Sequence, residues 1–187
     1  IAVVMRTPCD DLDLVRGFLI TEGILENLSV VSRIDLEQKK NHALVFLNDE
    51  ADVDYQRLKR NLYSASSCGI CGKASIESIR QDHPRVEGDF VIPADRILEL
   101  PDKLRDAQRV FASTGGLHAV ALFDAQGKLL VLREDVGRHN AIDKVIGHGV
   151  SAQIDFSRCV MQVSGRVSFE VMQKAHAVGV PVISAIS

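Results

Sequence analysis

The sequence predicts a globular α/β protein with a sheet covered by helices, and three observations support this fold class. The 187 residues are 46% hydrophobic, which is enough for one full core and a small additional lobe. In the second half, apolar runs rich in β-branched residues alternate with segments of helical periodicity. A hairpin there feeds a β-α-β-α-β series, which is typical of parallel strands joined by right-handed crossovers. The elements expected in this half are strands at 118–123 and 128–133, a helix at 141–148, a strand at 158–163, a helix at 169–178 and a strand at 182–186.

Residues 1–62 are predicted to form a small N-terminal α+β lobe. Thr7 is a suitable helix cap, and Pro8 follows at the first helical position. The helix is expected to run to about Glu22 and to pack its apolar face on a sheet. Two β-rich runs between residues 30 and 47 flank a polar turn and predict a hairpin.

The middle of the chain separates this lobe from the main core. Residues 63–92 are predicted to form a mobile loop and linker, because the small residues of SASSCGICGKAS bury little apolar surface. Two successive helices are expected at 93–100 and 101–112, with Pro101 opening the second. Residues 93–187 then form the core domain.

Composition limits the function classes. A net charge of -3 gives no basic field that would attract nucleic acid, so no nucleic-acid partner is expected. No run of eighteen consecutive apolar residues occurs, and the first residues lack the features of a secretory signal. The chain is therefore predicted to be cytoplasmic, without a membrane partner.

The sharpest chemical signal is the dithiol Cys68-Gly69-Ile70-Cys71. Two thiols at this spacing can share a redox step, bind a metal or pass a sulfane sulfur. A buried structural pair would not be surrounded by Ser and Gly, so we favour a reactive pair. A structural zinc site needs four ligands, and the sequence contains no second Cys-x-x-Cys, although His118 or His139 remain possible additional ligands. Thioredoxin-like exchange is weaker still, because its motif belongs at a strand-to-helix turn.

Two loops are expected to follow strands and to open helices, which is where open α/β sheets bind anions. The first, EDVGRHN at 134–140, combines charged residues with Gly, His and Asn. The second, SGRVS at 164–168, offers hydroxyls and an Arg. The ordinary alternatives are a solvated charge run for the first loop and a simple helix cap for the second. Asp143 and Lys144 either extend the first site or lie on the wet face of its helix.

A third motif, Thr114-Gly115-Gly116-Leu117-His118, precedes a predicted strand. Its paired glycines permit close approach of a ligand, and His118 is able to donate to that ligand or move a proton. Taken alone, a tight turn with an ordinary surface histidine explains the motif better. The candidate cofactor-binding residues are Thr114, Gly115, Gly116, His118, Asp135, Arg138, His139, Asn140, Ser164, Gly165, Arg166 and Ser168.

Several long motifs follow one another along the chain: MRTPCDDLDLVRGFLITEGI, SSCGICGKAS, FASTGGLHAVAL, REDVGRHNAIDKVIG, SGRVSFEVMQKA and GVPVISAIS. In this order they resemble the FdhD/NarQ family of formate dehydrogenase accessory proteins. The resemblance implies that Cys68 and Cys71 carry a persulfide, loaded by a cysteine desulfurase. It further implies delivery of the sulfur to a molybdenum or tungsten cofactor in its bis(molybdopterin guanine dinucleotide) form, for formate dehydrogenase.

The resemblance also carries expectations about structure. It implies a fold similar to that of cytidine deaminases, a homodimer, and family segments missing at both ends of this chain. Deaminases place metal ligands at two helix starts, whereas this sequence has Ser164-Gly165-Arg166 where a cysteine pair is required. No catalytic metal is therefore predicted. The alternative function is a chaperone that only holds the cofactor, with Cys68 and Cys71 as a structural or zinc-binding pair.

Overall fold

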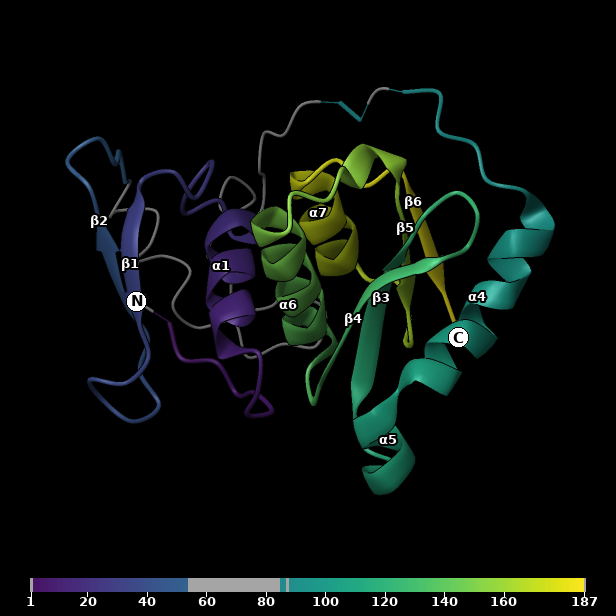
Figure 1. Ribbon diagram of the computed structural model, residues 1–187, viewed down its shortest axis with the longest axis horizontal. Coiled ribbons are helices and arrows are strands. Elements are labelled where there is room, and N and C mark those ends of the chain that lie inside the picture. The colour runs from purple at the N-terminus through teal and green to yellow at the C-terminus, as the bar shows by residue number, and fades with distance from the viewer. Residues whose placement is uncertain (1, 54–84, 87, 187) are drawn as a thin grey trace.

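The architecture is layered around a four-stranded mixed sheet (Figure 1). The computed structural model describes residues 2–53, 85–86 and 88–186, so the predicted dithiol lies outside the described residues. The mixed α/β class expected from the sequence is confirmed, while the likeness to cytidine deaminases stays a prediction. The proposed division into domains also stays a prediction.

The central sheet has the strand order β4-β3-β5-β6. Its strands are β3 (His118–Phe123), β4 (Leu129–Asp135), β5 (Val160–Val163) and β6 (Val182–Ala185). β3 pairs antiparallel with both β4 and β5, and only β5 and β6 form a parallel pair. The expected run of neighbouring parallel strands is thus wrong for β4, because β3 lies between β4 and β5. All the same, β4, β5 and β6 point in one direction, so their carboxyl ends lie at one edge.

Helices cover both faces of this sheet. On one face lie α6 (Arg138–Ser151) and α7 (Phe169–Ala177), and on the other lies α4 (Ala94–Ala107). Along β3, Val120 and Leu122 belong to the core under α6, whereas Ala121 and Phe123 belong to the core under α4. This alternation is the two-residue period of a strand buried on both sides.

The helix boundaries before β3 differ from the sequence prediction. α4 continues through Pro101 and ends at Ala107, with Gln108 as its C-cap, and the six-residue α5 (Arg109–Thr114) follows. Leu100 and Leu104 are both fully buried against the sheet, and this burial favours an unbroken helix over a break at Pro101.

The first helix, α1 (Asp11–Thr21), packs against α6 and α7 instead of against a sheet. Gly17 and Gly147 allow this close approach, because a Cβ on Gly17 would lie 1.8 Å from the backbone oxygen of Asp143. The helix also begins later than predicted. Its N-cap residue is Asp10, and Thr7 bonds to the end of β4 instead of capping α1.

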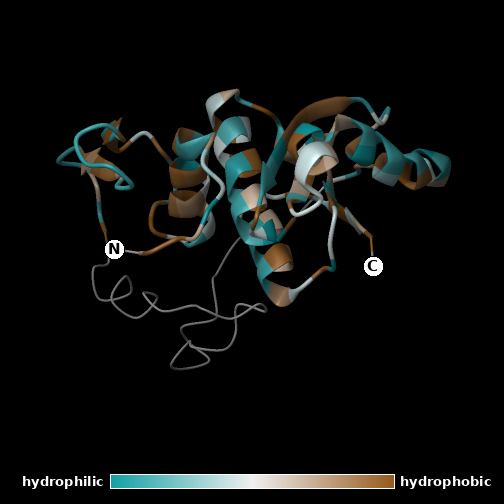
Figure 2. Cartoon of the chain, turned by 90° about the horizontal axis from the view of Figure 1, so that it is seen from below, coloured by the Kyte–Doolittle hydropathy of each residue, from teal (hydrophilic) through white to brown (hydrophobic). Residues whose placement is uncertain are grey.

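The predicted hairpin is confirmed as β1 (Val31–Asp35) paired antiparallel with β2 (Leu44–Leu47). A short 3-10 turn, η1 (Phe156–Arg158), leads into β5. In Figure 1 the hairpin, α1, α6 and the sheet follow one another from left to right, and Figure 2 keeps this order in the perpendicular view. Across the described residues, no helix combines the length and the apolar character that crossing a bilayer requires.

Candidate functional site

Two helix N-termini meet at one edge of the sheet. Two residues separate the end of β4 from the start of α6, and five residues separate the end of β5 from the start of α7. Between them stands His118, the first residue of β3, which is paired in register with Asp135. A Cβ on Gly165 would lie 3.5 Å from the imidazole of His118 and 3.9 Å from Cδ of Arg138. The two loops predicted to bind anions therefore lie side by side, and we call this region the crevice.

Asp135 is fully buried and uses its carboxylate inside the fold. Its Oδ2 lies 2.7 Å from Nζ of Lys144, whose side chain is also completely buried. The same oxygen accepts the N–H of Thr7 at 3.0 Å, and Oδ1 accepts Nδ2 of Asn140 at 2.9 Å and the N–H of Gly137 at 3.0 Å. Asp135 thus joins the end of β4, the start of α6 and the N-terminal segment.

Lys144 and Asp143 contradict the wet-face interpretation, because both are buried. Lys144 Nζ donates to the carbonyl oxygens of Thr7 at 3.0 Å and Glu134 at 3.3 Å. Asp143 lies 2.9 Å from Nζ of Lys174, which also contacts Thr21 and Glu22 of the α1 end. The only sequence signal for this burial is the apolar neighbourhood AIDKVIGHGV, which the prediction did not weigh.

Other charged residues at the end of β4 are also engaged within the fold. The Glu134 carboxylate accepts the N–H groups of Val110 and Phe111, both at 2.8 Å, and so caps α5. Arg133 forms an ion pair with Asp13 of α1 at 2.8 Å. Much of the charge density that suggested a ligand site therefore holds neighbouring elements together.

His139 is the most perturbed histidine of the crevice. Burial lowers its pKa to about 4, the charges of Arg138 and Lys174 act in the same direction, and Glu22 opposes them. Burial and Arg138 also lower the pKa of His118. Both side chains are hence neutral imidazoles at pH 7, able to accept as well as donate a hydrogen bond.

In the second loop, two serines bond to the backbone and an arginine is exposed to solvent. Ser164 Oγ accepts the N–H of Ala119 at 2.8 Å, which fixes the loop to β3. Ser168 is the N-cap of α7, as the ordinary interpretation expected, because its Oγ accepts the N–H of Val171. Arg166 is exposed between them. A phosphate at this place would meet the N-terminus of α7 and a guanidinium.

The glycine motif lies at the end of α5. Thr114, Gly115 and Gly116 are exposed, and Gly115 has a φ of 68°, which ends the helix in the left-handed conformation that glycine favours. The ordinary interpretation of a turn thus explains this geometry, and only His118 of the motif reaches the crevice edge. Within the described ranges, no group of three or more His, Cys, Asp or Glu residues is placed to hold a metal ion.

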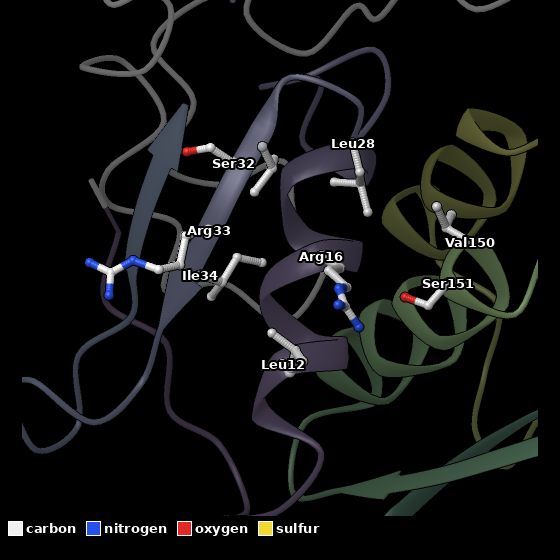
Figure 3. A pocket seen from close by; sticks show the side chains of 9 residues that line it. Leu12, Arg16, Leu28, Ser32, Arg33, Ile34, Val150 and Ser151 are labelled. Atoms are coloured by element: carbon white, nitrogen blue, oxygen red, sulfur yellow. The ribbon is translucent and has the colours of Figure 1, made fainter. Parts of the chain in front are cut away.

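A cavity of about 420 Å³ lies at the other end of α6 (Figure 3). α6 has 14 residues, which separates its two ends by about 21 Å. The cavity therefore does not coincide with the crevice. Its lining comes from α1, the connection from α1 to β1, β1 and the last residues of α6. It comprises Leu12, Arg16, Leu28, Val31, Ser32, Arg33, Ile34, Val150 and Ser151.

Comparisons with known proteins agree on one family. A protein from Streptomyces avermitilis named sulfur carrier protein FdhD is 42% identical to this chain over 203 residues. The match covers 100% of this chain and 71% of that protein. The protein of the same name from Mycobacterium tuberculosis is 43% identical over 204 residues, covering 100% and 73%. The counterpart from Saccharolobus solfataricus is 41% identical over 188 residues, covering 100% and 69%.

The fold has a solved counterpart as well. A crystal structure from Desulfotalea psychrophila, assigned as a formate dehydrogenase accessory protein, matches with a TM-score of 0.71 at 21% identity. The match covers 97% of this chain and 67% of the other, and at this identity it concerns the fold alone. The model of the FdhD/NarQ family matches residues 1–187, so the chain belongs to the FdhD/NarQ family.

Proposed function

We propose that this protein is a cytoplasmic sulfur carrier that serves formate dehydrogenase. Membership of the FdhD/NarQ family and relatives named sulfur carrier proteins support the sulfur role. The observation that carries the proposal in the structure is the convergence of the α6 and α7 N-termini on one crevice, beside His118 and Arg138. Such an arrangement suits the phosphates of a dinucleotide.

In the proposed reaction, a thiolate of the Cys68 and Cys71 pair attacks the terminal sulfur of a cysteine desulfurase persulfide. A new S–S bond forms on this protein, the S–S bond of the desulfurase breaks, and the desulfurase cysteine leaves as a thiolate. No external oxidant or reductant is needed, because one persulfide replaces another. For delivery, the second thiol of the pair attacks the inner sulfur of the persulfide, a disulfide between Cys68 and Cys71 forms, and the outer sulfur leaves at the sulfide level. The two thiols thus supply the two electrons, and the sulfur passes to the substrate, a molybdenum cofactor in its bis(molybdopterin guanine dinucleotide) form. The assembly is a homodimer.

The crevice residues would divide the work of holding that substrate. Arg138 and Arg166 supply positive charge for phosphates, together with the helix N-termini. The neutral imidazoles of His118 and His139 supply hydrogen bonds without adding charge. Asp135 and Asn140 stabilise the connection between β4 and α6 through their mutual hydrogen bond, and this connection positions Arg138 and His139.

The sulfur step is tested by mass spectrometry. Incubation with a cysteine desulfurase and cysteine is expected to add one sulfur atom to a peptide that contains Cys68 or Cys71. The matched control is a Cys159→Ala variant, which lacks a buried cysteine elsewhere and is expected to load normally. Absence of any sulfur adduct on the wild type would refute the carrier role.

The cofactor chaperone is the second candidate, and a Cys68→Ala/Cys71→Ala variant separates the two. If this variant restores active formate dehydrogenase in cells that lack the protein, the chaperone function is right and sulfur transfer is wrong. For the crevice, Arg166→Ala is expected to weaken GDP binding by about tenfold, measured by calorimetry, because a charged hydrogen bond is lost. Unchanged affinity would remove this loop from the site.

A further inference from the structure

Glu170 lies beside His139 at the crevice, and neither the predicted site nor the family comparison gives it a role. Its Oε2 is 3.1 Å from Nδ1 of His139, and the two side chains are only 16% and 18% exposed. The other ring nitrogen of His139, Nε2, lies 3.5 Å from Oγ of Ser168. The imidazole of His139 on α6 therefore contacts two residues at the N-terminus of α7, Ser168 and Glu170.

The charge around Glu170 favours its ionised form. It stands in the first turn of α7, where the helix dipole stabilises an anion. Glu170 also contributes to the raised pKa of Lys174, so the ammonium of Lys174 in turn stabilises the Glu170 carboxylate. An ionised carboxylate is an acceptor only.

A neutral imidazole carries one proton, and its position decides what the crevice can recognise. His139 is neutral at pH 7, because its pKa is lowered to about 4. The contact of 3.1 Å between Nδ1 and Oε2 lies outside hydrogen-bond geometry and acts through charge. With the proton on Nε2, the electron-rich Nδ1 would face a negative oxygen, which is repulsive. With the proton on Nδ1, the same contact is attractive, and Nε2 keeps its lone pair.

We propose that Glu170 is a positioning residue that fixes His139 as the Nδ1–H tautomer, so that Nε2 is a hydrogen-bond acceptor in the crevice. The hydroxyl of Ser168 is consistent with this direction, because it accepts from Val171 and keeps its own proton to donate toward Nε2. At 3.5 Å the Ser168 contact is long, so an O–H or N–H group of a ligand can replace it. His139 thus selects a donor group, such as a ribose hydroxyl or a guanine N–H, and the arginines take the phosphates. This ligand class rests on the proposed function.

The tautomer is measured directly by long-range ¹H–¹⁵N NMR correlation of the histidine rings at pH 7. In the wild type, His139 is expected to show the Nδ1–H pattern. Glu170→Ala and Glu170→Gln both remove the negative charge beside Nδ1, and both are expected to change this to the Nε2–H pattern. Met172→Ala, an exposed change on the same helix, serves as the control and leaves the tautomer unchanged.

A purely structural role for Glu170 would lower the melting temperature of Glu170→Ala without changing the tautomer, and that outcome overturns the proposal. An Nε2–H pattern in the wild type also overturns it, even if the alanine variant does not fold. GDP binding gives a second measurement, with an affinity loss of about fivefold expected for Glu170→Ala, since one hydrogen bond to the ligand is lost. If the wild type does not bind GDP at all, the proposed function of the crevice fails, while the NMR result still decides the role of Glu170.

Discussion

The two strand-to-helix junctions of the crevice look alike in the sequence but use their polar residues differently. At the β4–α6 junction, Asp135 and Asn140 bond to each other and to the N-terminal segment. At the β5–α7 junction, Ser164 and Ser168 fix the backbone, and Arg166 remains exposed. The difference shows that a dense cluster of charges can serve the fold, while the loop with fewer charges leaves an arginine exposed. Variants at the two junctions are therefore expected to separate stability from binding.

The largest expected effect is the loss of the buried ion pair at the first junction. Asp135→Ala leaves the ammonium of Lys144 buried without its anionic partner, and breaking such a pair costs about 3–5 kcal/mol of unfolding free energy. The control at the second junction is Arg166→Ala, which is exposed and is expected to change stability by less than about 0.5 kcal/mol. Urea denaturation of both variants measures the contrast.

A double variant tests whether the unpaired buried charge of Lys144 causes that loss of stability. Asp135→Leu/Lys144→Met replaces both charges by apolar groups, and such replacements are often close to neutral. The double variant removes the unpaired buried charge and is thus expected to regain part of the lost stability, whereas the N–H groups of Thr7 and Gly137 still lack their acceptor. Equal losses in Asp135→Ala and Arg166→Ala would contradict the proposed difference between the junctions.

A smaller effect is expected from the helix contact that supports the first junction. Gly147→Ala places a Cβ 1.9 Å from the backbone oxygen of Asp13, so α1 and α6 must separate. Overpacking of this kind costs about 1–3 kcal/mol, and the gain of about 1 kcal/mol in helix propensity offsets part of the cost. At the second junction, Gly165→Ala meets its nearest atoms at 3.5 Å, an ordinary contact, and is expected to be neutral. Thermal unfolding that ranks the two glycine variants the other way would refute this assignment of close packing.

The sequence predicted where helices and strands lie along the chain better than which strands pair with one another, and the reason is physical. Periodicity is local, so β3, the hairpin and the helix mouths at Arg138 and Phe169 were found within a few residues. The insertion of β3 between β4 and β5 depends on pairing between distant segments, which no local pattern records.

The candidate site shows the same limit. The adjacency of the two loops followed from strand direction, a rule of α/β sheets, and is seen where Nε2 of His139 lies 3.5 Å from Oγ of Ser168. The burial of Lys144 was missed, because a charged residue on a helix is most often solvated. Thr7 was misassigned as a cap, because its real partner, the N–H of Val136, lies 129 residues away in the sequence.

A further expected effect concerns the pH dependence of His139, which links the two junctions. The pKa of His139 is about 4 in the folded protein and near 6.5 when unfolded, so between these values the unfolded chain binds more protons. Stability from this group therefore rises as the pH increases from 4 to 6.5. Compared with His139→Gln, the wild type is expected to lose melting temperature more steeply on acidification through this window. The raised pKa of Asp143, about 6, acts in the opposite direction in both proteins and cancels in the difference.

The cause of this shift can be tested at the same histidine. Arg138 lies at the mouth of α6, and its charge is one of the groups that lower the pKa of His139. Arg138→Ala is expected to move that pKa upward, toward 6.5, and the NMR titration of the imidazole measures the change. Burial is the larger cause, however, so the pKa is expected to stay below 6.5 in this variant. A pKa that returned fully to 6.5 would mean that charge, and not burial at the junction, keeps His139 neutral.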